Sequence, residues 1–130
     1  PTVVDPARHV AADVGDEALL LARAAGVMVA PDRTAGARAI VEERPNADLI
    51  IMDDGLQNPS LAKDLRIAVV DGARGLGNGL VIPSGPLRAP LAVQLAHTDI
   101  VVVNGRRSDR DGIARAIAPA FTGPVLSAHQ

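Results

Sequence analysis

The sequence predicts an α/β fold in which a parallel sheet carries helices on both of its faces. Short apolar runs alternate along the 130 residues with segments that favour helix, and this is the β-α-β-α pattern of parallel sheets. Only one aromatic side chain is present, so aliphatic side chains must fill the core. Because a chain of this length suffices for one core, the sequence predicts a single α/β domain over residues 1–130.

The first third of the chain contains two predicted helices and one predicted strand. The polar residues 5–13 indicate a loop, whereas the Ala and Leu content of residues 18–25 favours a helix. Residues 27–30 form a short apolar run that predicts a strand. Residues 34–43 then favour a second helix, for which Thr34 is the expected N-cap.

Two carboxylates, Asp16 and Glu17, stand at the beginning of the first predicted helix. Acidic side chains near a helix N-terminus stabilise the helix by complementing its dipole. The same two side chains are also candidates for acid–base chemistry, and the residues alone leave both explanations open.

The most informative stretch is the apolar run at residues 49–52, which is followed by Asp53, Asp54 and Gly55. A short continuous apolar run predicts a strand that is buried on both faces. Asp53 and Asp54 would then lie at its carboxyl end, where open α/β sheets place their ligands, and such carboxylates can hold the Mg²⁺ that bridges nucleotide phosphates. The alternative is that Asp-Asp-Gly is merely a polar turn.

The second half of the chain continues the alternation. Residues 61–65 predict one helical turn, and residues 67–70 predict a buried strand that ends at Asp71. Residues 72–90 are dense in Gly and Pro, and the apolar residues among them indicate an ordered loop that can approach a ligand closely. The remaining predictions are a helix at residues 91–96, a strand at 99–103, a helix capped by Ser108 that ends near Ala118, and a strand at 125–127.

Composition excludes several classes of function. The absence of Cys rules out disulfides and thiolate metal sites. A net charge of −2 and the absence of Trp and Tyr argue against a nucleic-acid partner, since neither a basic surface nor a stacking platform is available. No apolar stretch approaches the ~20 residues that span a bilayer, so we expect this segment itself to be soluble. The chain begins with Pro-Thr-Val-Val, and we interpret it as a fragment of a longer protein.

Four motifs together resemble a known family. They are VGDEALLLA at residues 14–22, DDGLQ at 53–57, DGARGLGNG at 71–79 and PSGPLR at 83–88. The same motifs occur in the same order and at similar intervals in the tetraacyldisaccharide 4'-kinases. The resemblance extends from about Val4 to Gly105.

This resemblance implies a P-loop NTPase-like fold, of which this chain is a central part. It also implies a kinase on the cytoplasmic face of the bacterial inner membrane, in contact with the membrane surface through parts outside this chain. The reaction of the family is transfer of the γ-phosphate of ATP, with Mg²⁺, to the 4'-hydroxyl of the acylated disaccharide precursor of lipid A. ATP, Mg²⁺ and this precursor are therefore the expected ligands.

The resemblance also assigns roles to the acidic residues. Asp16 matches the proposed base toward the sugar hydroxyl, and Glu17 matches the neighbour that assists near the metal. Asp53 and Asp54 match the acidic pair on the metal side.

Three further residues match positions near the nucleotide and the cleft. Gln57 completes the DDGLQ motif, Arg33 lies after the short second strand, and Arg88 belongs to the motif associated with the active-site cleft. Both Arg side chains are suited to neutralise phosphate charge. Two positions depart from the family pattern: Asn58 stands where a His is usual, and Ala89 stands where a Glu usually follows the Arg.

The sequence contains no G-x-x-x-x-G-K-[ST] motif, so it lacks the loop that cradles nucleotide phosphates. We therefore expect the isolated segment to be inactive even if its parent is a kinase. The alternative is a non-catalytic α/β regulatory or Mg-binding module. Receiver domains of that kind need a Lys late in the chain, whereas the only Lys here is Lys63.

Overall fold

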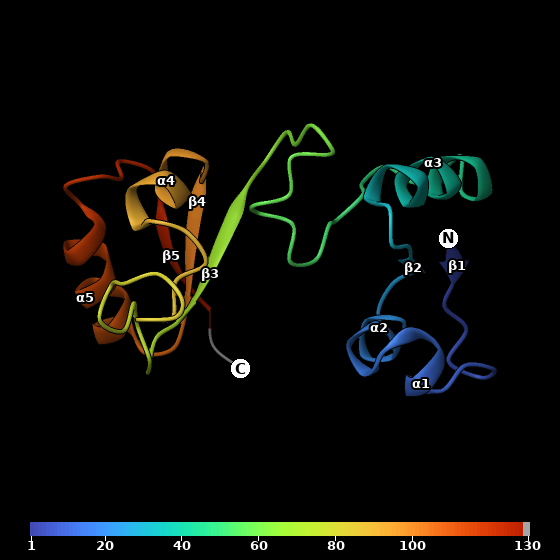
Figure 1. Ribbon diagram of the computed structural model, residues 1–130, viewed down its shortest axis with the longest axis horizontal. Helices are drawn as coiled ribbons and strands as arrows, with labels where there is room; N and C mark the ends of the chain where they lie inside the picture. The colour runs from blue at the N-terminus through green and yellow to red at the C-terminus, as the bar shows by residue number, and fades with distance from the viewer. Residues whose placement is uncertain (129–130) are drawn as a thin grey trace. The chain divides into compact units, whose positions relative to one another are not determined.

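The computed structural model describes residues 1–128, which divide into two compact units (Figure 1). Unit 1 comprises residues 1–53 and 59–61, and unit 2 comprises residues 54–58 together with the chain from residue 62 onward. Each unit has its own sheet and helices. The single domain expected from the sequence stays a prediction.

Unit 1 is built on a two-stranded antiparallel sheet in which Thr2 pairs with Val29 and Val3 with Met28. Its buried apolar side chains are those of Val4, Val14 and Ala30. The predicted strand at 27–30 and the predicted helix at 34–43 are confirmed. The helix predicted at 18–25 is present but ends at Leu21, and a short helix at residues 11–14 lies largely where we expected a loop. The elements of unit 1 are β1 (Thr2–Val3), α1 (Ala11–Val14), α2 (Asp16–Leu21), β2 (Met28–Val29) and α3 (Arg33–Glu43).

The N-cap of α3 is Asp32 and not Thr34, so that prediction is wrong. The Asp32 carboxylate accepts hydrogen bonds from the backbone N–H groups of Thr34 at 2.8 Å and Ala35 at 3.2 Å. One carboxylate thereby satisfies two amides that have no partner within the helix. The Thr34 hydroxyl lies one residue inside the helix and donates instead to the carbonyl oxygen of Ser60 at 3.3 Å.

Unit 2 contains a three-stranded parallel sheet of β3 (Ile67–Asp71), β4 (Ile100–Asn104) and β5 (Val125–Ala128), in this order (Figure 1). Ile67 pairs with Ile100, and Val101 pairs with Val125. The three predicted strands and both predicted helices of this region are confirmed, which establishes the α/β character of the chain. The elements of unit 2 are β3 (Ile67–Asp71), α4 (Leu91–Ala96), β4 (Ile100–Asn104), α5 (Arg107–Ile117) and β5 (Val125–Ala128).

The core of unit 2 lies on one face of this sheet. Val101 and Val103 of β4 are almost completely buried, and they pack with Leu95 of α4 and with Ile113 and Ile117 of α5. Both helices therefore cover the same face. The sequence predicted helices on both faces of the sheet. In the described part of the chain, α4 and α5 both lie on this one face.

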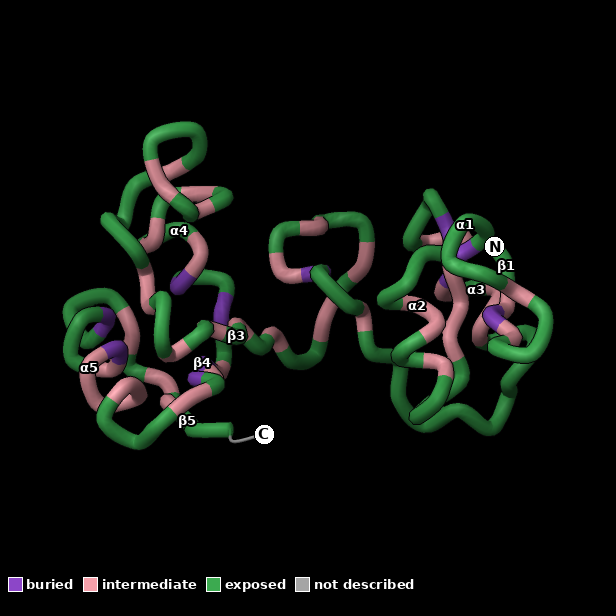
Figure 2. Tube along the Cα trace, turned by 90° about the horizontal axis from the view of Figure 1, so that it is seen from below, coloured by how far each residue is buried: buried purple, intermediate pink, exposed green. Residues whose placement is uncertain are grey.

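The opposite face of the sheet carries apolar residues that the described part of the chain leaves largely exposed. Figure 2 colours each residue of the trace by its burial. Val69 of β3 is 71% exposed and Leu126 of β5 is 49% exposed. Because neighbours in register share a face, Val102 of β4 lies between them. The prediction that residues 67–70 form a buried strand is thus correct for the strand and wrong for its burial.

Residues 49–52 do not form a strand in the structure, so the predicted central strand is wrong. Leu49 is 74% exposed and Ile51 is 82% exposed, and no regular element includes them. An apolar run becomes a buried strand only when neighbouring strands satisfy its backbone groups. None does so for this segment in the described chain. The helical turn predicted at residues 61–65 is also absent.

The Gly-rich segment at residues 72–90 is an ordered loop, as predicted. The Asn78 side chain fixes it, since its amide nitrogen donates to the Ser84 carbonyl at 2.8 Å and its amide oxygen accepts from the Leu80 N–H at 3.1 Å. Gly77 has a φ of 59°, and a Cβ atom there would lie 2.7 Å from Cγ of Pro86. This close approach explains the need for glycine at that position.

The N-cap of α5 is Arg106, so the prediction of Ser108 as cap is wrong. The carboxylate of Asp109 reaches back from the first turn and accepts the backbone N–H of Arg106 at 2.8 Å. A carboxylate at this position satisfies a free amide and complements the helix dipole, and a hydroxyl is not needed.

Candidate functional site

The shortest contact between two predicted site residues lies in unit 2 and joins Arg88 to Asp54. The Nη1 atom of Arg88 donates to both carboxylate oxygens of Asp54, each at 2.6 Å. This hydrogen bond, together with the charge of Asp54, raises the pKa of Arg88. Both side chains are more than half exposed, so the pair lies at the surface of the unit.

Asp54 is held in this position by an unusual backbone conformation. Its φ is 51°, and it is the only residue other than glycine with a positive φ among those that the structure describes. Asp tolerates this left-handed region better than most residues. Residues 53 and 54 form a turn, which agrees with the alternative interpretation, and the metal role of the two carboxylates stays a prediction.

A second contact links the same two segments of unit 2. The side-chain amide of Gln57 donates from Nε2 to Oε1 of Gln94 at 3.0 Å. Gln94 in turn donates from Nε2 to the carbonyl oxygen of Ala89 at 2.6 Å. Residues 54–58 are therefore tied to the segment that includes Arg88 and the beginning of α4 by an ion pair and an amide bridge.

Gln94 was not among the residues predicted from the sequence. It is the one polar residue in α4, whose sequence is otherwise apolar, and it is only partly exposed. A lone polar residue in an apolar helix usually has a hydrogen-bond partner. That signal was present in the sequence, but it could not indicate the partner, which lies 37 positions away.

Asp16 and Glu17 lie in unit 1, in the first turn of α2, and both are exposed. The Asp16 carboxylate accepts the backbone N–H of Glu17 at 3.0 Å. The predicted position near a helix N-terminus is confirmed, and the dipole explanation is consistent with it. The role of Asp16 as a base stays a prediction.

Arg33 is the first residue of α3 and follows β2 closely, as the sequence predicted. Its Nη1 atom donates to the carbonyl oxygen of Ala30 at 3.1 Å. This bond holds the guanidinium near the end of β2, and the other N–H groups of the guanidinium have no hydrogen-bond partner among the described residues.

The fit of the acidic pair to Mg²⁺ depends on its donor atoms. Carboxylate oxygens are the ligands that Mg²⁺ prefers, but Arg88 already contacts both oxygens of Asp54. Asp53 is exposed, and its carboxylate takes part in no hydrogen bond or ion pair within residues 1–128. No group of three or more His, Cys, Asp or Glu residues able to hold a metal occurs among the described residues. In this conformation the carboxylate of Asp54 is occupied by Arg88, and Asp53 belongs to unit 1.

The two positions that depart from the family pattern both contribute backbone oxygens to unit 2. The carbonyl of Asn58 accepts a hydrogen bond from Nζ of Lys63, and the carbonyl of Ala89 accepts from Gln94. Neither contact requires a particular side chain at residue 58 or 89. The local structure is therefore compatible with Asn58 and Ala89.

The arrangement in unit 2 is suited to bind an anion. Arg88 uses only Nη1 toward Asp54, and its Nε and Nη2 groups have no hydrogen-bond partner within residues 1–128, so they can donate to phosphate.

A small pocket found in unit 1 contains none of the predicted site residues; it is lined by Val3, Gly26, Val27, Met28, Ile40, Glu43 and Arg44. Among the described helices, none has the length and apolar character needed to cross a membrane.

Comparison with known proteins gives a consistent family. The family model described as tetraacyldisaccharide-1-P 4'-kinase matches residues 1–129. A tetraacyldisaccharide 4'-kinase of Methylobacterium radiotolerans is 60% identical over 116 residues, which cover 89% of this chain and 35% of the relative. One from Rhodopseudomonas palustris strain BisB5 is 52% identical over 128 residues, which cover 98% of this chain and 37% of the relative.

The chain thus spans about a third of the length of the curated relatives that it matches. No solved structure gives a significant match. Since the family model covers nearly the whole chain, including all four motifs, this chain belongs to the tetraacyldisaccharide-1-P 4'-kinase family.

Proposed function

We propose that the protein of which this chain is part is an ATP-dependent kinase that phosphorylates the 4'-hydroxyl of the tetraacyldisaccharide 1-phosphate precursor of lipid A. The observation that carries this proposal is the family match over residues 1–129, which contains all four motifs in order. The names of the relatives support the same activity. The proposal includes a P-loop NTPase-like fold and action at the cytoplasmic face of the inner membrane.

Asp16 is the proposed base toward the acceptor hydroxyl. Its carboxylate is exposed at the beginning of α2, so a substrate hydroxyl can reach it without displacing buried side chains. General-base assistance of this kind contributes typically about 10²- to 10⁴-fold in rate. Glu17, the next residue, is proposed to assist from the same turn.

Arg88 and Arg33 are proposed to neutralise phosphate charge. Phosphoryl transfer depends mainly on positioning and on stabilisation of charge at the phosphoryl oxygens. Asp54 supports this role because it fixes one nitrogen of Arg88 and leaves the rest of the guanidinium to donate. Gln57 is proposed to contact the nucleotide through its amide oxygen.

Magnesium belongs to the proposal because transfer from ATP generally uses it to neutralise the phosphates. Asp53 is the carboxylate of the acidic pair that has no protein partner within residues 1–128, so it is the first candidate ligand. Asp54 becomes a ligand only if Arg88 releases it.

The experiment that tests the activity uses the full-length protein. Transfer of ³²P from ATP to the tetraacyldisaccharide 1-phosphate should be observed, and it should fall strongly in Asp16→Asn. Absence of transfer by the purified wild-type protein in detergent, with ATP and Mg²⁺ present, would contradict the proposal.

A second experiment concerns the 130-residue chain alone, which we propose is inactive. The sequence contains no G-x-x-x-x-G-K-[ST] loop to cradle the phosphates. Without such positioning the activation barrier can be higher by about 7 to 11 kcal/mol. Calorimetric titration with Mg-ATP should give weak binding, and the ³²P assay should give no transfer. Tight nucleotide binding by this chain would place the nucleotide site within it, and Mg²⁺ binding without nucleotide would favour the regulatory module.

A further inference from the structure

We infer that Gln94 is a positioning residue for the candidate site: it fixes the orientation of the Gln57 amide and the backbone next to Arg88. This inference rests on the proposed function for its kinetic consequence. Its structural basis is the pair of hydrogen bonds from Gln57 to Gln94 and from Gln94 to Ala89. Gln94 thereby joins Gln57, which lies 37 positions before it in the chain, to Ala89, the residue that follows the PSGPLR motif.

The contact uses both ends of the Gln94 amide. Oε1 accepts from Gln57 at 3.0 Å, and Nε2 donates to the Ala89 carbonyl at 2.6 Å. An amide is the only uncharged side-chain group with both a carbonyl acceptor and an N–H₂ donor. A Leu at this position makes neither bond, and an ionised Glu makes only the bond from Gln57.

The Ala89 contact also determines which way the Gln94 amide points. The Ala89 carbonyl can only accept, so it requires the N–H₂ end of Gln94. Oε1 is then directed to Gln57, and it requires the N–H₂ end of Gln57 in turn. As a result the Gln57 carbonyl oxygen is the end left without a partner in the described part of the chain, and it can accept a hydrogen bond or ligate a cation.

The same bridge restrains Arg88. Ala89 follows Arg88 directly, so a bond to the Ala89 carbonyl limits movement of the backbone that carries the guanidinium. Asp54 restrains the other end of Arg88 through Nη1. Arg88 is therefore held both at its backbone and at its guanidinium, and Gln94 supplies the first of these restraints.

Kinetics of the full-length kinase test the inference. Gln94→Leu should lower kcat by about 10- to 100-fold, the range typical of residues that orient a ligand-binding group. Gln94→Glu, which keeps the Gln57 bond, should retain more activity than Gln94→Leu. Val93→Ala is the matched control, because Val93 is the preceding residue of α4 and is 51% exposed, and it should leave kcat unchanged.

A double-mutant cycle separates positioning from general destabilisation. If Gln94 acts in part through Gln57, the effects of Gln57→Ala and Gln94→Leu should not be independent. The double variant should then lose clearly less kcat than the product of the two single fold-losses. Fully additive losses would overturn the inference, as would wild-type kinetics in Gln94→Leu.

A spectroscopic readout keeps this inference distinct from the proposed activity. In ¹⁵N spectra of the full-length protein, the side-chain N–H₂ signals of Gln57 should shift in Gln94→Leu and remain unchanged in Val93→Ala. If the wild-type protein transfers no phosphate, the proposed function fails, yet this shift still reports the bridge. If the Gln57 signals do not respond to Gln94→Leu, the inference fails whatever the activity.

Discussion

Arg88 and Asp54 lie 34 positions apart in the chain, and one nitrogen of the Arg88 guanidinium contacts both oxygens of the Asp54 carboxylate. A guanidinium that pairs through a single nitrogen keeps its other donors for a second anion. The geometry therefore allows Arg88 to bind its carboxylate and a phosphate together.

This relationship predicts that Arg88→Lys will lower the activity of the full-length kinase. An ammonium group is a compact charge, and it cannot reproduce the planar set of donors that serves two anions. We expect kcat/KM to fall by about 10²-fold, since misplacement of a substrate group by about 1 Å can cost this much. Arg74→Lys is the control, because Arg74 is an exposed Arg of the same Gly-rich segment and should tolerate the change. Full activity of Arg88→Lys would contradict the role of Arg88.

Asp16→Asn should lower kcat of the full-length kinase by about 10²- to 10⁴-fold while the affinity for ATP changes little. An amide cannot accept the proton of the acceptor hydroxyl, whereas its carbonyl oxygen can still accept the backbone N–H of Glu17. Steady-state kinetics and nucleotide titration measure the two effects separately. Asp13→Asn in α1 is the control. Equal losses in turnover and ATP affinity, or no loss, would favour the helix-dipole explanation.

Asp32→Ala should destabilise unit 1 by about 0.5 to 2 kcal/mol, because two amides at the beginning of α3 lose their acceptor. Asp32→Ser should retain most of the stability, since its hydroxyl can accept one of these bonds. Far-UV circular dichroism during urea unfolding is the appropriate measurement, because the chain has no Trp or Tyr to report by fluorescence. Equal stability of the Ala and Ser variants would show that the cap contributes little.

The two faces of the unit 2 sheet should respond differently to substitution. Ile117→Ala should cost about 2 to 5 kcal/mol, because Ile117 is buried between α5 and the sheet. Val69→Thr should change stability by no more than about 0.5 kcal/mol, because Val69 is already 71% exposed. Urea unfolding of the same chain compares them directly. A large loss in Val69→Thr would mean that this face is covered in solution.

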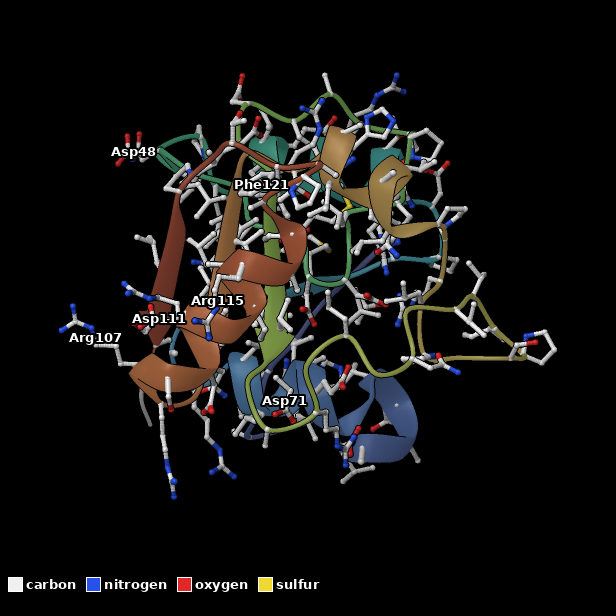
Figure 3. The ribbon with its side chains drawn as sticks, turned by 90° about the vertical axis from the view of Figure 1, so that its left-hand side faces the viewer. Asp48, Asp71, Arg107, Asp111, Arg115 and Phe121 are labelled. Carbon is white, nitrogen blue, oxygen red and sulfur yellow. The ribbon has the colours of Figure 1, made fainter. Side chains whose placement is uncertain are left out.

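The pKa of Asp111 on α5 predicts a pH dependence of stability. Figure 3 labels Asp111 together with Arg107 and Arg115 of the same helix. The hydrogen bond from Arg110 lowers the pKa of Asp111, with smaller contributions from the charges of Arg110, Arg107 and Arg115. A carboxyl group with a lowered pKa stabilises the fold above its ordinary pKa of about 4, and this contribution is lost as the pH falls through the lower folded value. Asp111→Asn should therefore lower Tm at pH 7 and leave it unchanged at the acid end of a pH series. The same Tm difference at both ends would exclude this cause.

Local patterns in the sequence were enough to predict most helices and strands. Apolar runs and turn residues correctly predicted the helix at Leu91–Ala96 and the strands β3, β4 and β5. Each of these elements has its apolar pattern along its whole length, so local sequence was sufficient. The same reasoning was wrong at residues 49–52. An apolar run indicates that a segment needs burial, but it does not show whether neighbouring strands are present to provide it.

The candidate site was predictable only in part. The motifs identified Asp54, Gln57 and Arg88, yet no pattern in the sequence showed that Asp54 would pair with Arg88 or that Gln94 would hold Gln57. Such contacts depend on how distant segments fold together. The cap at Asp32 was missed for a different reason, since Thr34 and Asp32 are both good caps and only the helix start distinguishes them.

The uncovered face of β3, β4 and β5 determines how the isolated chain behaves at high concentration. Its exposed Val69 and Leu126 side chains attract other apolar surfaces, and a net charge of −2 with a pI near 5.9 provides little repulsion against this attraction. Solubility should therefore be lowest near pH 6 and should fall further in sulfate salts, which strengthen the association of apolar surfaces. The concentration at which this chain stays in solution should therefore depend on association through one sheet face as much as on the stability of the fold.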